Sequence, residues 1–166
     1  MILTLLSLSI FLLYLAIVLR YINHVPQSLS ETFYLIGDQP KCYLFTATLW
    51  VMVFTLMPPL LDITADNWDF LAFLALTGIG FVGAAPFFHD SGEGTVHTVA
   101  AIIAAVFGLA WCAAALKWWS AATIGVSLAG CTFGAYKTKT IRSGRTFWLE
   151  MVAFASVYLS AIIKML

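Results

Sequence analysis

Charged residues are scarce in this sequence. Asp, Glu, Lys and Arg make up only 10% of its 166 residues, against about a quarter in soluble domains. The eight acidic and eight basic residues cancel to a formal net charge of zero. The chain therefore lacks the overall excess of basic charge by which proteins attract nucleic acids, and we expect no nucleic-acid partner.

Cysteine is equally rare and is not arranged for metal binding or cross-linking. The three cysteines, Cys42, Cys112 and Cys131, are odd in number and form no C-x-x-C pair. This spacing argues against both a disulfide framework and a zinc finger. We expect the cysteines to act as small apolar packing residues.

What the sequence does contain is long apolar runs. Hydrophobic residues make up 62% of the chain, and the longer runs approach the ~20 residues that a membrane-spanning helix needs. Because only helices and closed barrels satisfy their backbone groups in a bilayer, and these runs are too long for barrel strands, we predict one all-α integral membrane domain over residues 1–166. The six predicted transmembrane helices lie at residues 2–21, 43–61, 70–88, 98–116, 121–136 and 147–165.

Small residues recur on two of these predicted spans. Gly78, Gly80 and Gly83 occur in the third span, and Ala100 and Ala104 lie on one stripe of the fourth. Small residues let membrane helices approach closely. We therefore expect close helix packing along these stripes.

The first polar connection contains a helix signal of its own. Ser28 and Glu31 fit the S-x-x-E capping box, in which each side chain satisfies a free backbone N–H at a helix start. Apolar residues then follow at helical spacing until Gly37. We predict a short interfacial helix over residues 29–36, between the first and second spans and lying on the membrane surface.

The basic residues are distributed unevenly about the predicted spans, and this predicts an orientation. Six lie in the connections after the first, third and fifth spans, whereas two lie on the opposite side. Since cytoplasmic loops carry the excess of Lys and Arg, we expect these three connections in the cytoplasm and both termini outside. The six are Arg20, Lys41, Lys137, Lys139, Arg142 and Arg145.

This topology gathers the polar side chains at the cytoplasmic membrane edge, and Glu150 lies about one turn inside the last span at the same level. A carboxylate within a span is costly and tends to have a partner, for which His89, His97 and Arg145 are candidates. We expect a polar pocket here that binds a small or lipid-derived ligand. Its candidate binding residues are Ser30, Glu31, Tyr34, His89, Asp90, Glu93, His97 and Glu150.

Three other interpretations of these residues remain open. His89, Asp90 and His97 could hold zinc or another divalent metal, because imidazole and carboxylate suit such ions, although no H-E-x-x-H motif is present. Alternatively, the acidic and hydroxyl residues only cap helix ends, and the histidines lie at the headgroup level. A small transporter or channel is the third possibility, with few polar residues such as Ser156 and Ser160 to line a path.

Two stretches carry a resemblance. Residues 28–34 (SLSETFY) and residues 81–86 (FVGAAP) resemble small polytopic membrane proteins of gut Bacteroidetes and their phages, a group with no assigned activity. That resemblance implies a multi-pass protein of the bacterial inner membrane. The cluster of His89, Asp90 and His97 is also distantly similar to the alkaline-ceramidase and PAQR-like superfamily, which implies a zinc-dependent lipid hydrolase. That superfamily has seven helices and a late H-x-x-x-H pair, which this chain lacks.

Overall fold

The described part of the chain is a helical membrane bundle. The computed structural model describes residues 1–37, 41–64, 67–88, 92–116 and 145–166. Within these ranges, five helices are long and apolar enough to cross a membrane, which makes this a multi-pass membrane protein. The fifth predicted span, residues 121–136, lies outside the described residues. The elements are α1 (Ile2–Ile22), α2 (Glu31–Ile36), α3 (Tyr43–Ile63), α4 (Asp69–Ala84), the 3-10 turn η1 (Ala85–Phe87), α5 (Gly92–Leu116) and α7 (Arg145–Met165).

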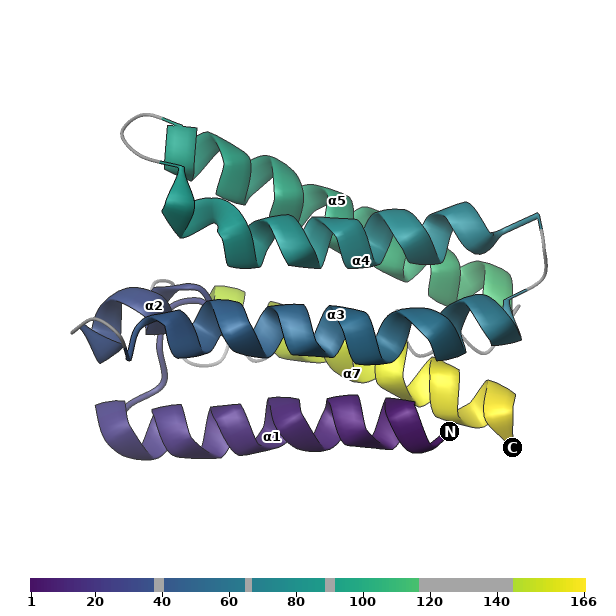
Figure 1. Ribbon diagram of the computed structural model, residues 1–166, viewed down its shortest axis with the longest axis horizontal. Helices are drawn as coiled ribbons and strands as arrows, with labels where there is room; N and C mark the ends of the chain where they lie inside the picture. Colours follow the sequence, from purple (N-terminus) through teal and green to yellow (C-terminus); the bar gives the residue numbers. More distant parts are fainter. Residues whose placement is uncertain (38–40, 65–66, 89–91, 117–144) are drawn as a thin grey trace.

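The long helices run roughly alongside one another, with α3 between α1 and the α4–α5 pair (Figure 1). The two chain ends lie at the same end of the bundle, where the Thr4 hydroxyl is 3.6 Å from the Met165 sulfur. The short helix α2 lies at the opposite end, beside the start of α3 (Figure 1). The end of α4 and the start of α5 also lie at the α2 end of the bundle (Figure 1).

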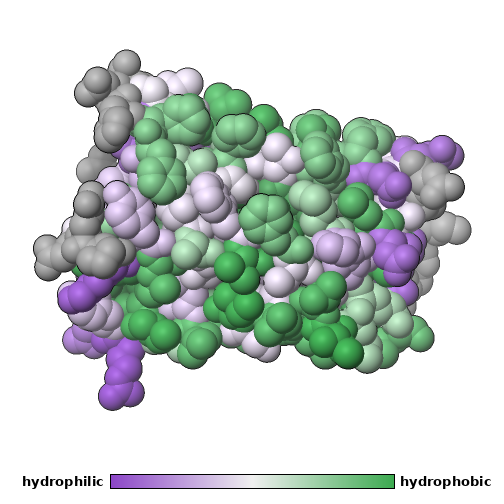
Figure 2. Space-filling view, viewed as in Figure 1, coloured by the Kyte–Doolittle hydropathy of each residue, from purple (hydrophilic) through white to green (hydrophobic). Residues whose placement is uncertain are grey.

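The outer surface matches a lipid environment. The face seen in Figure 2 is mostly hydrophobic along its length, and hydrophilic residues gather towards the two ends. Ile2, Phe54 and Ile102 keep 81%, 71% and 57% of their surface exposed. In water such exposure would favour aggregation, whereas in a bilayer it places aliphatic and aromatic groups against lipid chains.

Close packing between α4 and α5 depends on glycine. A Cβ atom at Gly78 would lie 2.6 Å from the Ala104 nitrogen and 2.8 Å from the Ala100 carbonyl oxygen, distances that no side chain could occupy. The close helix packing expected along these small residues is confirmed at Gly78, and the partner helix, which the sequence did not indicate, is α5. Gly80 has a different role, because a Cβ there would meet nothing within 4 Å, and its carbonyl oxygen accepts a hydrogen bond from the Trp50 indole at 3.1 Å.

Several helix boundaries differ from the predicted ones; the helix α4, for example, ends at Ala84 rather than at 88. The helix α3 continues through Pro58 and Pro59 to Ile63 instead of ending at 61. The helix α5 begins at Gly92 rather than at 98. Its first turn therefore includes Gly92, Glu93 and Gly94, although glycine disfavours helix. As a result, Glu93 and His97 lie four residues apart on one helix, and residues at this spacing share a helix face.

Several buried polar side chains within the bundle are hydrogen-bonded between helices. The Ser7 hydroxyl lies 2.7 Å from the Tyr158 hydroxyl and donates to the Met52 carbonyl, which joins α1, α7 and α3. At the other end of α3, Trp111 of α5 donates its indole N–H to the Thr64 hydroxyl at 2.7 Å. Pairing of this kind is needed where no water is present to satisfy polar groups.

Candidate functional site

The short helix α2 forms close to the predicted position but begins at Glu31 rather than at residue 29. Half of the predicted capping box is present, because the Ser28 hydroxyl accepts a hydrogen bond from the Glu31 backbone N–H at 3.2 Å. The Glu31 carboxylate accepts from the Gln27 backbone N–H instead of completing the box with Ser28. The helix ends at Gly37, whose φ of 75° favours glycine.

A chain of hydrogen bonds holds α2 against α1. The Tyr14 hydroxyl of α1 lies 2.5 Å from the hydroxyl of Thr32, and Thr32 donates to the Leu29 carbonyl, also at 2.5 Å. With Thr32 as donor to Leu29, Tyr14 is the donor to Thr32. All three residues are buried, so these bonds satisfy polar groups that water does not reach.

The same connection is also bonded to the start of α7. The Glu150 carboxylate accepts a hydrogen bond from the Leu29 backbone N–H at 2.5 Å, and the Phe147 N–H donates to the Gln27 carbonyl at 2.8 Å. The second bond satisfies one of the N–H groups that a helix start leaves free. Together they fix residues 27–29 to the last helix.

The partner of Glu150 therefore differs from those expected. A backbone amide, that of Leu29, pairs with the carboxylate, and the described residues contain no direct hydrogen bond between Glu150 and His97. The Arg145 side chain, the third candidate, is outside the described part of the chain. A carboxylate offers about four acceptor positions, so Glu150 keeps acceptor capacity beyond its bond to Leu29.

An elongated apolar cavity of about 270 Å³ lies between α3, α4, α5 and α7. Glu150 and His97 belong to its lining, together with Ser30. Most of the remaining lining is aliphatic or aromatic, and a row of small residues on α5 keeps the space open. The small residues are Ala101, Ala104, Ala105 and Gly108.

A second, more polar cavity of about 360 Å³ adjoins the first beneath α2. Its lining includes Tyr34 of α2 and both Glu93 and His97 of α5. The Tyr34 hydroxyl donates a hydrogen bond to the Glu93 carboxylate, which closes the space between α2 and α5. Four residues line both cavities, so the polar space and the apolar space meet there, and two of the four, Ser30 and His97, are polar. The other two are Phe45 and Val82.

The structure thus brings together five of the eight predicted binding residues. They are Ser30, Tyr34, Glu93, His97 and Glu150. Glu31 is bonded to Gln27 and lines neither cavity. His89 and Asp90 lie outside the described residues.

Comparison with protein-family models, curated proteins and solved structures finds no match. The chemistry of the site therefore rests on its own residues. Among the described residues, no group of three or more His, Cys, Asp or Glu side chains is placed to hold a metal ion. Two of the three tentative zinc ligands, His89 and Asp90, fall outside that part of the chain.

What the described site offers is a polar mouth and an apolar interior. Carboxylates at Glu93 and Glu150 accept hydrogen bonds or attract a cation, whereas Ser30 and the His97 imidazole can both donate and accept. The aliphatic cavity behind them excludes polar groups but accommodates hydrocarbon. Sequence reasoning missed this cavity, because no motif marks it and it results from packing.

Proposed function

We propose that this chain is a six-span protein of the bacterial inner membrane that binds a small, lipid-derived ligand between α2, α5 and α7. The ligand's polar head group lies in the mouth beside Tyr34, Glu93 and His97, and its hydrocarbon part enters the apolar cavity. The observation that carries the proposal is the meeting of the two cavities at Ser30 and His97, with Glu150 in the wall of the inner one.

The polarity of the lining favours a head group of hydroxyls or an amine. Glu93 and Glu150 are hydrogen-bond acceptors in their ionised form, and they match donors on the ligand. Glycerol esters and long-chain amines have such head groups at the end of a hydrocarbon chain. A membrane supplies these molecules at the depth where the cavity lies.

The proposed fifth span, residues 121–136, is supported by the positions of the chain on either side of residues 117–144. Trp111, near the end of α5, bonds to Thr64 at the end of α3. Phe147, at the start of α7, bonds to Gln27, in the connection between α1 and α2. The short helix α2 lies at the end of the bundle where α3 begins (Figure 1). Residues 117–144 therefore connect opposite ends of the bundle, and a crossing by residues 121–136 makes that connection.

Six crossings place the α2 connection on the side that the basic residues mark as cytoplasmic. The short helix α2 then lies at the inner membrane surface as an interfacial helix. Its exposed Tyr34 ring is suited to the headgroup region. Both chain ends lie on the outer side in this arrangement.

Filling the inner cavity tests ligand binding. Ala153 of α7 lines the cavity, whereas Ala155 on the same helix is exposed and lines none of the cavities described. Native mass spectrometry of detergent-purified protein with monooleoylglycerol should show bound lipid for the wild type and for Ala155→Phe. Ala153→Phe should lose it. If circular dichroism shows that both phenylalanine variants are folded, equal binding of monooleoylglycerol by the two would contradict the proposal.

A further inference from the structure

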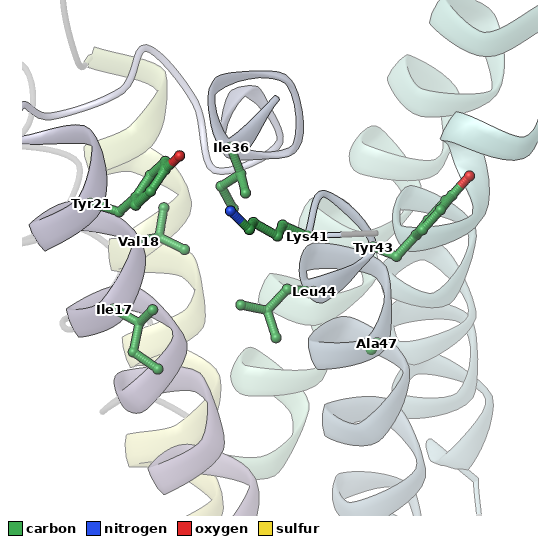
Figure 3. Close-up of a pocket in the computed structure, with 8 residues that line it drawn as sticks. All are labelled: Ile17, Val18, Tyr21, Ile36, Lys41, Tyr43, Leu44 and Ala47. Carbon is green, nitrogen blue, oxygen red and sulfur yellow. The ribbon is translucent and has the colours of Figure 1, made fainter. Parts of the chain in front are cut away.

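A separate cavity of about 500 Å³ lies between α1 and α3 and shares no lining residue with the cavities already described. Its walls are aliphatic, from Ile17 and Val18 on α1 and from Leu44 and Ala47 on α3. Ile36 of α2 closes the end nearest the polar connections (Figure 3). We call this cavity the α1–α3 groove.

A cationic side chain lies across the mouth of the α1–α3 groove. Lys41, two residues before α3, extends from the start of that helix towards Tyr21 and Ile36 (Figure 3). Lys41 is exposed, and no carboxylate among the described residues forms an ion pair with it. Tyr21 of α1 and Tyr43 of α3 also line this end, and tyrosine is enriched at the level of lipid head groups.

We propose that the α1–α3 groove binds an anionic phospholipid, with one acyl chain between α1 and α3 and the phosphate on the Lys41 ammonium. The aliphatic walls match the chain, and the positive charge at the mouth matches the head group. Basic pockets between membrane helices bind anionic lipid heads in this way. Arg20, exposed in the last turn of α1, adds a second positive charge at the same end.

This site is independent of the ligand cavity beside Glu150. The two share no lining residue, although both are lined in part by α3. Phe45 and Leu49 of α3 line the inner cavity, whereas Leu44 and Ala47 line the groove. The groove also lies open between α1 and α3, where a bilayer lipid reaches it sideways without passing α2. Loss of one site therefore leaves the other to be tested.

The charge of Lys41 and the shape of the groove are tested separately. Detergent-purified protein is titrated with the anionic lipid dioleoyl phosphatidylglycerol or the zwitterionic lipid dioleoyl phosphatidylcholine, and native mass spectrometry counts the bound lipid. Wild-type protein should bind the anionic lipid more tightly. Lys41→Gln should weaken that binding about fivefold, as expected for the loss of one basic residue near an anionic surface, and leave phosphatidylcholine binding unchanged. Lys41→Arg should restore the preference.

Ala47→Phe should block the groove and reduce binding of both lipids, whereas Ile102→Phe, at an exposed position on α5, should reduce neither. Glycerophosphoglycerol, which has the head group without chains, should not compete. The inference is overturned if folded Lys41→Gln protein keeps the wild-type preference, or if the chain-free head group competes as well as the lipid. The second result would identify a simple phosphate site.

Discussion

The Glu150 carboxylate accepts a hydrogen bond from the backbone N–H of Leu29, 121 residues earlier in the chain. Glu150→Ala should leave this buried amide unsatisfied and lower the free energy of unfolding by about 1–3 kcal/mol. Glu150→Gln keeps an acceptor oxygen and should cost less. Thermal unfolding in detergent, followed by circular dichroism, measures both. If alanine and glutamine were equally harmless, the bond would have no part in stability.

Gly78 and Gly80 form a matched pair on α4. Alanine at Gly78 would place a methyl group 2.6 Å from the Ala104 nitrogen, so α4 and α5 must separate. We expect a loss of about 1–3 kcal/mol, as for other overpacked sites. Alanine at Gly80 meets nothing within 4 Å and should be neutral, or stabilising by up to about 1 kcal/mol through its higher helix propensity. Unfolding measurements that rank the two variants in the reverse order would contradict this packing.

Tyr14 and Thr32 should act as a unit in holding α2. Tyr14→Phe and Thr32→Val each remove one hydroxyl from the chain of bonds that reaches the Leu29 carbonyl. In a double-mutant cycle, the combined loss of stability should differ from the sum of the single losses by about 0.5 kcal/mol or more. Ser9→Ala, which removes an exposed hydroxyl bonded only within α1, is the control and should add independently.

The proposed crossing by residues 121–136 predicts opposite accessibility for its two flanks. Single cysteines at Ser120 and Thr140, in a background without native cysteine, should label from opposite sides of the membrane. Asn67 and His24, both exposed, provide references for the outer and the cytoplasmic side. Labelling of positions 120 and 140 from one side would contradict the crossing and leave five spans. The assignment of the cytoplasmic side from the distribution of Lys and Arg would then no longer hold.

The sequence predicted the described long helices because each is an apolar run of membrane-spanning length, and hydropathy alone identifies such runs. It also predicted α2 from Ser28, Glu31 and Gly37. The starts of α2 and α5 were less predictable, because glycine and capping residues bias a boundary without fixing it. Glu150 was identified as a carboxylate within a span and in need of a partner. Its partner, the Leu29 amide, was not predicted. Every residue except proline has a backbone N–H, so the sequence does not indicate which of them a carboxylate will bond.

The inner cavity was also beyond sequence reasoning. Its position depends on how the α5 alanines face α3 and α7 across the bundle. Hydropathy identifies these residues as apolar but does not show where their packing leaves empty space. The polar residues at its mouth could be listed from the sequence because polar side chains are few. Their grouping around Ser30 and His97 required the fold.

The bonds from residues 27–29 to α7 bear on how the protein is made. The ribosome synthesises α1 and the connection after it long before α7, so the Leu29 amide must wait for Glu150 to emerge and insert before it gains its final partner. Until then the hydrogen bond between Tyr14 and Thr32 ties this connection to α1, and bonds such as those of Gln27 and Ser28 to Glu31 are local to the connection. The last helix therefore completes the first connection, and a nascent chain interrupted before Glu150 leaves that connection unfinished.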